Sequence, residues 1–261
     1  MQQSLHTEYV SYPSTEHEVR AYLAAPPGNG PWPTLIVIHE WTGLIPYVED
    51  VSRRLAREGY LALAPDLYSG DPDRASFEYD DMEEAGELNR APDIDEALRK
   101  RAPDRRDLLR RIHEWRQARS GKTYIPDLQA TMSYLRGRTD VIPTAIGAIG
   151  FCMGGRLSGT LATTGAKLAA ASIFYGPIPP LEGVPNIRCP MEGHYGSEDP
   201  SVTSRVPQLD AAMKAAGKDF AYFVYEGAPH SFFDRSFEEH EEACDDAWRR
   251  ILAFVRGPGM T

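Results

Sequence analysis

Cysteine is scarce in this sequence. The 261 residues contain three cysteines, Cys152, Cys189 and Cys244, and no two of them form a CxxC pair. An odd and sparse set of cysteines indicates neither a disulfide framework nor a zinc site. We therefore expect at least one free thiol, and we expect no metal ion and no organic cofactor.

Long apolar runs and an excess of positive charge are also missing. No apolar run approaches a membrane span, and the first residues, MQQSLHTEYV, have neither the basic start nor the apolar core of a secretory signal. The 28 Lys and Arg against 38 Asp and Glu give a net charge of −10, which disfavours nucleic acid and anionic membrane as partners. We expect a cytoplasmic monomer or homodimer that binds a small molecule.

Short apolar runs alternate with helical patterning along most of the chain. This alternation is typical of an α/β protein with a doubly wound, mostly parallel sheet of about eight strands. At 261 residues and 42% hydrophobic composition, one domain is the default. We predict strands at residues 6–12, 18–24, 34–39, 60–64, 145–150, 168–175, 190–195 and 220–225, and helices at 48–58, 125–136, 153–163, 206–216 and 238–254.

The stretch from Asp71 to Gly121 departs from this alternation. Residues 71–96 carry eleven acidic and two basic residues, whereas residues 97–122 carry ten basic and three acidic residues. Two helices of opposite charge, inserted over the edge of the sheet, would explain the pattern. Insertions at the carboxyl ends of strands often lie near an active site, so we interpret the segment either as a partial cap or as a solvated helical hairpin.

The most specific motif is Gly150-Phe151-Cys152-Met153-Gly154-Gly155, between a predicted strand and a predicted helix. It has the form G-x-C-x-G. In the nucleophile elbow of α/β-hydrolases a tight turn flanked by glycines presents the nucleophile at the top of the sheet. A helix N-terminus beneath Cys152 favours its thiolate form. No serine in the chain is flanked in the G-x-S-x-G manner, so Cys152 is the candidate nucleophile.

A candidate acid and a candidate base follow in the chain order that an elbow nucleophile requires. Asp199 comes after the predicted strand that ends near Tyr195, and His230 comes after the strand that ends near Tyr225. Both are expected at the same edge of the sheet as Cys152. Glu198 stays open as an alternative acid, because a pattern does not decide between adjacent residues of a loop.

The loop His39-Glu40-Trp41-Thr42-Gly43 follows the strand at 34–39. In this architecture that loop supplies one backbone N–H of the oxyanion hole, and the residue after the nucleophile supplies the other. We therefore expect the backbone N–H groups of Trp41 and Met153 to form the oxyanion hole. Glu40 would repel developing negative charge there, so it either turns to the surface or bonds the thiol.

These motifs together resemble the dienelactone hydrolases, also called carboxymethylenebutenolidases. The resemblance rests on the loop at 39–43, on Ala64-Pro65-Asp66-Leu67-Tyr68, on the elbow at 150–155, on 196–199, and on Ala228-Pro229-His230-Ser231-Phe232. It implies an α/β-hydrolase fold, a triad of Cys152, Asp199 and His230, and hydrolysis of a small ester or lactone through a thioester. It also implies that Glu40 holds the resting thiol and helps to deprotonate it.

The chain departs from the family where an arginine binds the substrate carboxylate. Four residues beyond the histidine stands Asp234, with Arg235 one residue later, and the other arginine of the family falls in the charged insertion. Arg105, Arg106, Arg110 and Arg235 are therefore the candidate partners of a substrate carboxylate. The alternatives to a lactone hydrolase are a general short-chain carboxylesterase and a catalytically idle α/β-hydrolase that binds a small molecule or a protein.

Overall fold

The computed structural model describes residues 4–88, 91–119, 123–235, 239–257 and 260. Its centre is one eight-stranded sheet in the order β1-β2-β4-β3-β5-β6-β7-β8. β2 runs antiparallel to its neighbours β1 and β4. All remaining neighbouring pairs, from β4-β3 to β7-β8, are parallel. The strands are β1 His6–Pro13, β2 Glu18–Ala25, β3 Trp32–Ile38, β4 Leu61–Pro65, β5 Val141–Phe151, β6 Ala171–Phe174, β7 Met191–Gly196 and β8 Phe220–Tyr225. The predicted α/β-hydrolase fold is confirmed.

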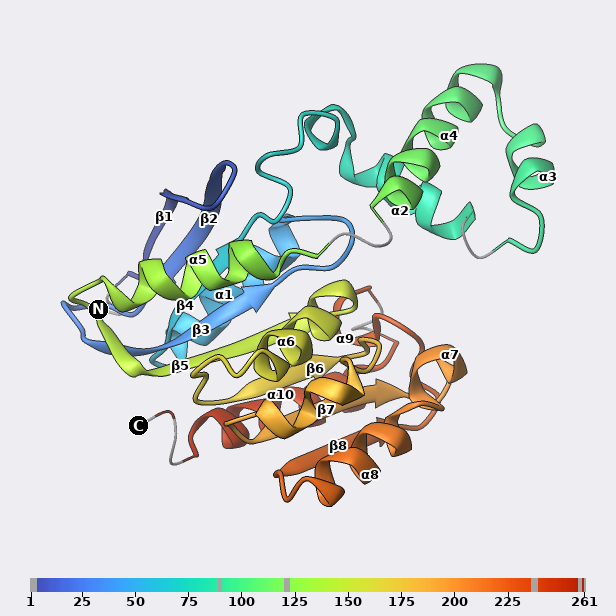
Figure 1. Ribbon diagram of the computed structural model, residues 1–261. Helices are drawn as coiled ribbons and strands as arrows, with labels where there is room; N and C mark the ends of the chain where they lie inside the picture. Colours follow the sequence, from blue (N-terminus) through green and yellow to red (C-terminus); the bar gives the residue numbers. More distant parts are fainter. Residues whose placement is uncertain (1–3, 89–90, 120–122, 236–238, 258–259, 261) are drawn as a thin grey trace.

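Helices cover both faces of the sheet (Figure 1). α1 Pro46–Arg57 and α10 Glu241–Val255 share one apolar cluster, whereas α5 Ile125–Arg136, α6 Met153–Thr163 and α8 Val206–Ala215 share the other. The shorter helices are α7 Pro200–Thr203, α9 Phe232–Arg235 and the 3₁₀ turns η1 Arg74–Ser76 and η2 Leu181–Asn186. Glu238, the predicted start of the last helix, lies outside the described residues. None of the helices that the structure describes is long and apolar enough to span a bilayer.

The central strands are apolar because both of their sides are covered. All five residues of β4 are buried, and so are all four residues of β6. β6 begins at Ala171, three residues later than predicted, and it ends at Phe174 because Tyr175 has a φ of 39°, a left-handed conformation that ends an extended strand. The strands thus form a rigid platform whose carboxyl ends carry the loops named above.

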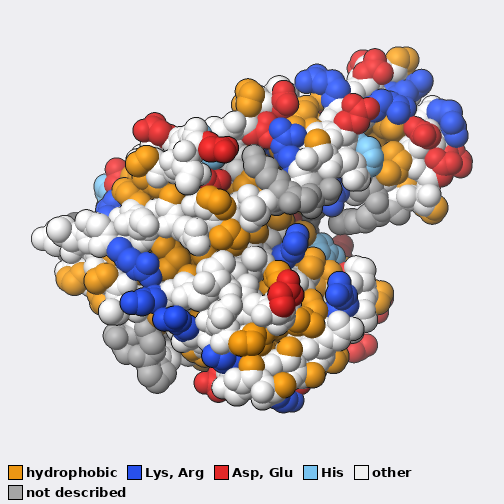
Figure 2. Space-filling model, in the orientation of Figure 1, with side chains coloured by type: hydrophobic (Ala, Val, Ile, Leu, Met, Phe, Trp, Pro, Cys, Tyr) orange, Lys and Arg blue, Asp and Glu red, His pale blue; other side chains and the backbone are white. Residues whose placement is uncertain are grey.

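The described part of the inserted segment contains three α-helices rather than the predicted two: α2 Tyr79–Leu88, α3 Ile94–Arg99 and α4 Pro103–Ala118. The side chain of Asp93 caps α3, and Pro103 stands in the first turn of α4. These two start signals produce a short helix, α3, across the boundary between the acidic and basic halves. The helices project from the body on the side toward which the parallel strands point (Figure 1). Acidic and basic side chains both gather on this projecting part (Figure 2).

Ion pairs and aromatic packing hold the insertion together and attach it to the body. Arg105 of α4 pairs with Asp81 and Glu84 of α2. Phe77 and Trp115 belong to the same buried apolar cluster as the strands, and Trp115 meets Tyr68 edge-on at a ring-centroid distance of 5.1 Å. The insertion therefore shares the hydrophobic core of the sheet.

Candidate active site

Cys152 occupies the turn between β5 and α6, with a φ of 50° and a ψ of −110°. A non-glycine residue adopts such angles only where its surroundings enforce them. The backbone is crowded at this turn. A Cβ added to Gly150 would lie 1.9 Å from the carbonyl oxygen of Gly154, and one added to Gly154 would lie 2.1 Å from that of Ile38. The glycines of the elbow motif are therefore required sterically, and the turn directs the thiol outward.

The structure brings the candidate base and acid to this thiol. His230 Nε2 lies 3.1 Å from Cys152 Sγ, and His230 Nδ1 lies 2.5 Å from Asp199 Oδ2. Asp199 follows β7 and His230 follows β8, so neighbouring strands position them. The two loops pack tightly, because Glu198 N–H donates to the carbonyl oxygen of Ala228 at 3.0 Å. The three side chains thus lie in the order thiol, imidazole and carboxylate, which is the order that a nucleophile, its base and an orienting acid would require.

The geometry distinguishes the two candidate acids. Asp199 is 6% exposed and bonds His230, whereas the adjacent Glu198 is exposed. Burial alone would raise the pKa of the Asp199 carboxyl, but hydrogen bonds from His230 and Ser201 outweigh burial and lower it. Burial alone would lower the pKa of His230, but its bonds to Asp199 and Cys152 raise it to about 10. Asp199 and Cys152 therefore both stabilise the protonated form of His230.

The loop after β3 lies beside the elbow. Neither Trp41 N–H nor Met153 N–H has a hydrogen-bond acceptor within the part of the chain that the structure describes. The N–H groups of a first helical turn have no partner inside the helix, which leaves Met153 N–H available to a ligand. Glu40 is 1% exposed, so the alternative in which it turns to the surface does not hold.

The neighbouring histidines have structural partners. His39 is buried, accepts a hydrogen bond from Leu67 N–H at its Nε2, and lies 2.5 Å from the carbonyl oxygen of Glu40 at its Nδ1. His194 is also buried and lies 2.9 Å from both Glu192 Oε1 and Tyr225 Oη. Both rings are therefore part of the packed frame around the site.

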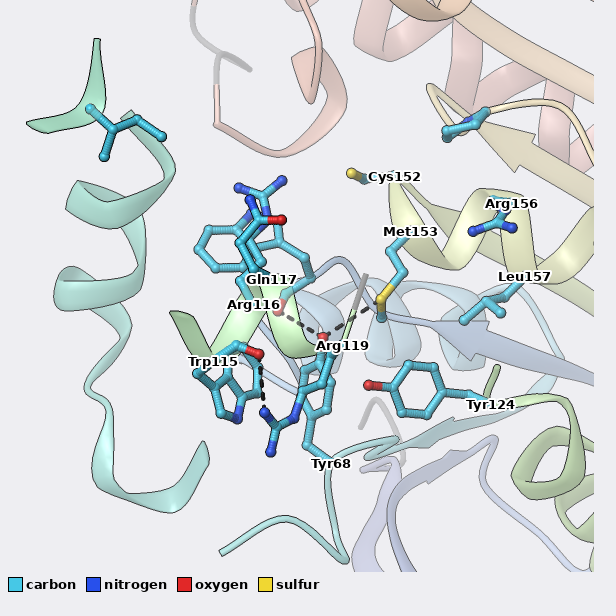
Figure 3. Close-up of a pocket in the computed structure, with 13 residues that line it drawn as sticks. Tyr68, Trp115, Arg116, Gln117, Arg119, Tyr124, Cys152, Met153, Arg156 and Leu157 are labelled. Carbon is cyan, nitrogen blue, oxygen red and sulfur yellow. Dashed lines mark hydrogen bonds between the residues drawn. The ribbon is translucent and has the colours of Figure 1, made fainter. Parts of the chain in front are cut away.

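A pocket of about 450 Å³ opens over Cys152. Its walls come from the elbow and α6, from the loops after β3, β4 and β6, and from α3 and α4 of the insertion (Figure 3). The lining residues are mostly aromatic, apolar or basic: Trp41, Tyr68, Ile94, Trp115, Arg116, Gln117, Arg119, Tyr124, Cys152, Met153, Arg156, Leu157 and Pro177. Such a wall suits a small, partly apolar ligand.

The arginines that line the pocket are not the ones predicted from sequence. Arg105 is held by Asp81 and Glu84, Arg106 donates to the carbonyl oxygen of Arg101, and Arg110 pairs with Asp95. None of these three is among the lining residues. The side chain of Arg235, the fourth candidate, lies outside what the structure describes.

Arg116, Arg119 and Arg156 line the pocket instead. Arg116 stacks over the ring of Trp41, and Arg119 is bonded to Asp71. Arg156 is exposed, one helical turn after Cys152, and its guanidinium has no bond or ion pair to any described residue. Its position in the first turn after the elbow is the signal that could have found it. Nothing in the charge pattern of the insertion marks Arg116 or Arg119.

No group of three or more His, Cys, Asp or Glu side chains in the described ranges is arranged to hold a metal ion. Cys189 and Cys244, the other thiols, are buried, and burial raises the pKa of each to about 11. The described residues bring a thiol, an imidazole and a carboxylate together at the elbow.

Known proteins resemble this chain in sequence and in fold. A protein of Saccharolobus solfataricus named "Putative carboxymethylenebutenolidase" is 34% identical over 259 residues, covering 95% of this chain and 97% of the relative. The crystal structure of a "Putative Dienelactone Hydrolase" from Klebsiella pneumoniae superposes with a TM-score of 0.74 at 27% identity and covers 97% of this chain and 99% of that chain. The phosphotriesterase P91, described as dienelactone hydrolase-like, shares the fold with a TM-score of 0.72 at 20% identity, covering 97% of this chain and 98% of that one. Residues 19–257 match the model of the dienelactone hydrolase family. This chain therefore belongs to that family of hydrolases, as its motifs predict.

Proposed function

We propose that the protein hydrolyses small esters or lactones with Cys152 as nucleophile, His230 as general acid and base, and Asp199 as the acid that orients His230. One observation carries the proposal: His230 bridges the two other side chains, 3.1 Å from the sulfur and 2.5 Å from the carboxylate. These distances allow proton transfer to and from the reacting atoms.

The first half of the reaction forms a thioester. The Cys152 thiolate attacks the carbonyl carbon, and the carbonyl oxygen becomes negative as the tetrahedral intermediate forms. The N–H groups of Trp41 and Met153 donate to that oxygen. His230 gives its proton to the departing alkoxide, the C–O bond breaks, and the acyl group stays on sulfur.

The second half releases the acid. In the thioester the sulfur carries no charge, so its contribution to the raised pKa of His230 is lost. The neutral form of His230 is then more favourable, and in this form the imidazole takes a proton from water. The hydroxide attacks the thioester, and the thiolate leaves and is stabilised again by the protonated imidazole. Asp199 keeps the ring in the required tautomer throughout.

The pocket supports a small, partly apolar substrate. A volume of about 450 Å³ admits one small acyl group with its leaving group. Aromatic walls from Trp41, Tyr68 and Trp115 favour an apolar or conjugated body, and Arg156 favours an anionic substituent. The segment at 71–121 acts in this proposal as a partial cap of a single domain.

Trapping of the acyl-enzyme tests this function. The His230→Ala protein, which lacks the deacylation base, is mixed with p-nitrophenyl acetate and analysed by intact mass and peptide mapping. We expect an acetyl group on Cys152, and no adduct in the Cys152→Ala, His230→Ala double variant. An idle binding protein gives no adduct with any activated ester. Rates on a panel of lactones against p-nitrophenyl esters separate a lactone hydrolase from a general short-chain carboxylesterase.

A further inference from the structure

We infer that Arg74 and Tyr68 are positioning residues that hold the oxyanion loop, residues 40–43, in its working conformation. The inference rests on the proposed function, because the loop matters only if Trp41 N–H receives the oxyanion. Arg74 lies in η1 at the start of the insertion, and Tyr68 lies in the loop after β4. Neither needs to contact the reacting atoms for this role.

Every carbonyl oxygen of residues 40–42 has a defined partner. The oxygen of Glu40 accepts from Gly43 N–H at 3.1 Å and lies beside His39 Nδ1. The oxygen of Trp41 accepts from the Tyr68 hydroxyl at 3.0 Å. The oxygen of Thr42 accepts from Arg74 through Nε at 3.2 Å and Nη2 at 2.6 Å.

Planar peptide groups transmit these contacts to the oxyanion site. Thr42 C=O and Gly43 N–H belong to one plane, so the two bonds from Arg74 also direct that N–H toward Glu40. Glu40 C=O and Trp41 N–H belong to one peptide plane and point in opposite directions. Fixing the Glu40 oxygen therefore also fixes the direction of Trp41 N–H. Tyr68 fixes the far side of Trp41. A donor held in advance needs no reorganisation during reaction, which is where an oxyanion hole gains its effect.

The packing around Gly43 fits this role. Gly43 has a φ of +95°, and a Cβ there would lie 3.2 Å from Arg74 Nε and 3.3 Å from the ring of Tyr68. Both side chains therefore pack closely against the backbone of the loop at Gly43, which has no side chain of its own. Arg74 Nη1 also donates to the carbonyl oxygen of Phe77 at 2.8 Å, so the same guanidinium attaches the start of the insertion to the loop.

The test compares chemistry that needs an oxyanion hole with chemistry that does not. Ester turnover develops charge on a carbonyl oxygen, whereas alkylation of Cys152 by iodoacetamide does not. Removing one oxyanion donor costs about 10²–10³ in kcat, and a displaced donor should cost less. We expect Arg74→Gln to lower kcat for p-nitrophenyl acetate by about 10- to 100-fold, with KM and the labelling rate of Cys152 close to wild type.

Arg138→Gln is the matched control. Arg138 is also partly buried and multiply bonded, but it pairs with Asp140 before the start of β5, at the other end of the strands. We expect it to leave kcat and labelling unchanged. Tyr68→Phe keeps the ring and removes only the hydroxyl, which donates to the carbonyl oxygen of Trp41 and also contacts Met153 Sδ at 3.6 Å. It decides the question if Arg74→Gln does not fold.

Three results would overturn the inference: unchanged kcat in both Arg74→Gln and Tyr68→Phe, an equal fall in kcat and labelling, or an equal loss in Arg138→Gln. The failure of the proposed function is distinguishable, because then no acyl group is trapped on Cys152 in the first place. If acyl-Cys152 forms and the two variants retain their kcat, only the positioning role is wrong.

Discussion

The carboxyl edge of the sheet and the inserted segment form opposite walls of one pocket by different means. At the edge, backbone touches backbone, as at Gly150 and Gly154, and the last seven residues of β5, which lead into the elbow, are all buried. In the insertion, α2 and α4 are joined by ion pairs that include the partly exposed Arg105, and aromatic rings attach them to the body. A crowded backbone tolerates few residue types at its positions, whereas helices joined by surface ion pairs tolerate many substitutions, because each such pair contributes little to stability. The edge is thus suited to chemistry and the insertion to substrate choice.

The largest effect should come from the edge. Cys152→Ala removes the proposed nucleophile while its side chain is only partly buried, so we expect the fold to persist and kcat to fall by at least about 10⁴-fold. Steady-state hydrolysis of p-nitrophenyl acetate and a thermal unfolding curve measure both quantities. If the variant retains its kcat, the carboxyl edge of the sheet does not supply the nucleophile.

Asp199→Asn should be the next most damaging change. An amide leaves His230 in the wrong tautomer, and in the serine-protease precedent such a change lowers kcat by about 10⁴. The pKa of His230 should also fall, because the bond to Asp199 is the first contribution that raises it. An NMR titration of the ring measures the pKa. Glu198→Gln is the matched control, and if it is the more harmful change, the proposed acid is one residue off.

The difference between the two regions also explains what could be predicted from the sequence. The elbow, the Asp199 loop and the His230 loop have local signals, because a sharp turn needs glycine and strand ends are marked by the end of an apolar run. The structure brings these side chains within bonding distance. The change of charge sign along residues 71–122 predicted an insertion of two helices. Helix starts depend instead on caps such as Asp93 and on Pro103, so the described part of the insertion has three α-helices.

The pocket arginines could not be predicted for a related reason. The direction of an arginine on a helix is set by its tertiary neighbours. Arg105 and Arg110 turn to acidic residues of α2 and α3, whereas Arg116 turns to Trp41. Only contacts between segments distant in sequence distinguish these cases, and a charge count contains no information about them.

A change in the insertion should alter selection more than rate. Trp115 is 6% exposed, packs on Tyr68 and lines the pocket. Trp115→Leu therefore enlarges the pocket and leaves the proposed triad unchanged. We expect KM for bulky aromatic esters to rise by about tenfold, the size of a lost apolar contact, while kcat for p-nitrophenyl acetate stays near wild type. Trp248→Leu, on α10, is the control. Unchanged preference across an ester panel would make the insertion irrelevant to selection.

Arg156 tests whether the pocket prefers an anion. Its guanidinium is exposed and has no partner within the described ranges, so Arg156→Gln should raise KM for a carboxylate-bearing ester by about fivefold, in keeping with the small free energy of an exposed ion pair. KM for the neutral ester of the same shape should not change. If Arg110→Gln has this effect instead, the arginine predicted from sequence is the correct one.

The smallest expected effect concerns Glu40 and the resting thiol. The N-terminus of α6 and the imidazole of His230, whose pKa is raised to about 10, both favour a thiolate at Cys152. Glu40, in the loop after β3, is 1% exposed, and a buried carboxylate in contact with the thiol would disfavour a second negative charge. We expect Glu40 to keep the thiol protonated until substrate displaces the carboxylate, so iodoacetamide should label Cys152 slowly in the free enzyme.

Glu40→Gln then separates thiol reactivity from turnover. Because the amide carries no charge, labelling of Cys152 should become about threefold faster, while ester turnover falls because the group that helps to deprotonate the thiol is lost. The two rates must move in opposite directions, and the Cys152→Ala protein corrects for labelling of Cys189 and Cys244. A general loosening of the site would speed labelling but would also lower the unfolding temperature. If Glu40→Gln labels no faster than wild type, Glu40 does not control the thiol, and its burial serves packing alone.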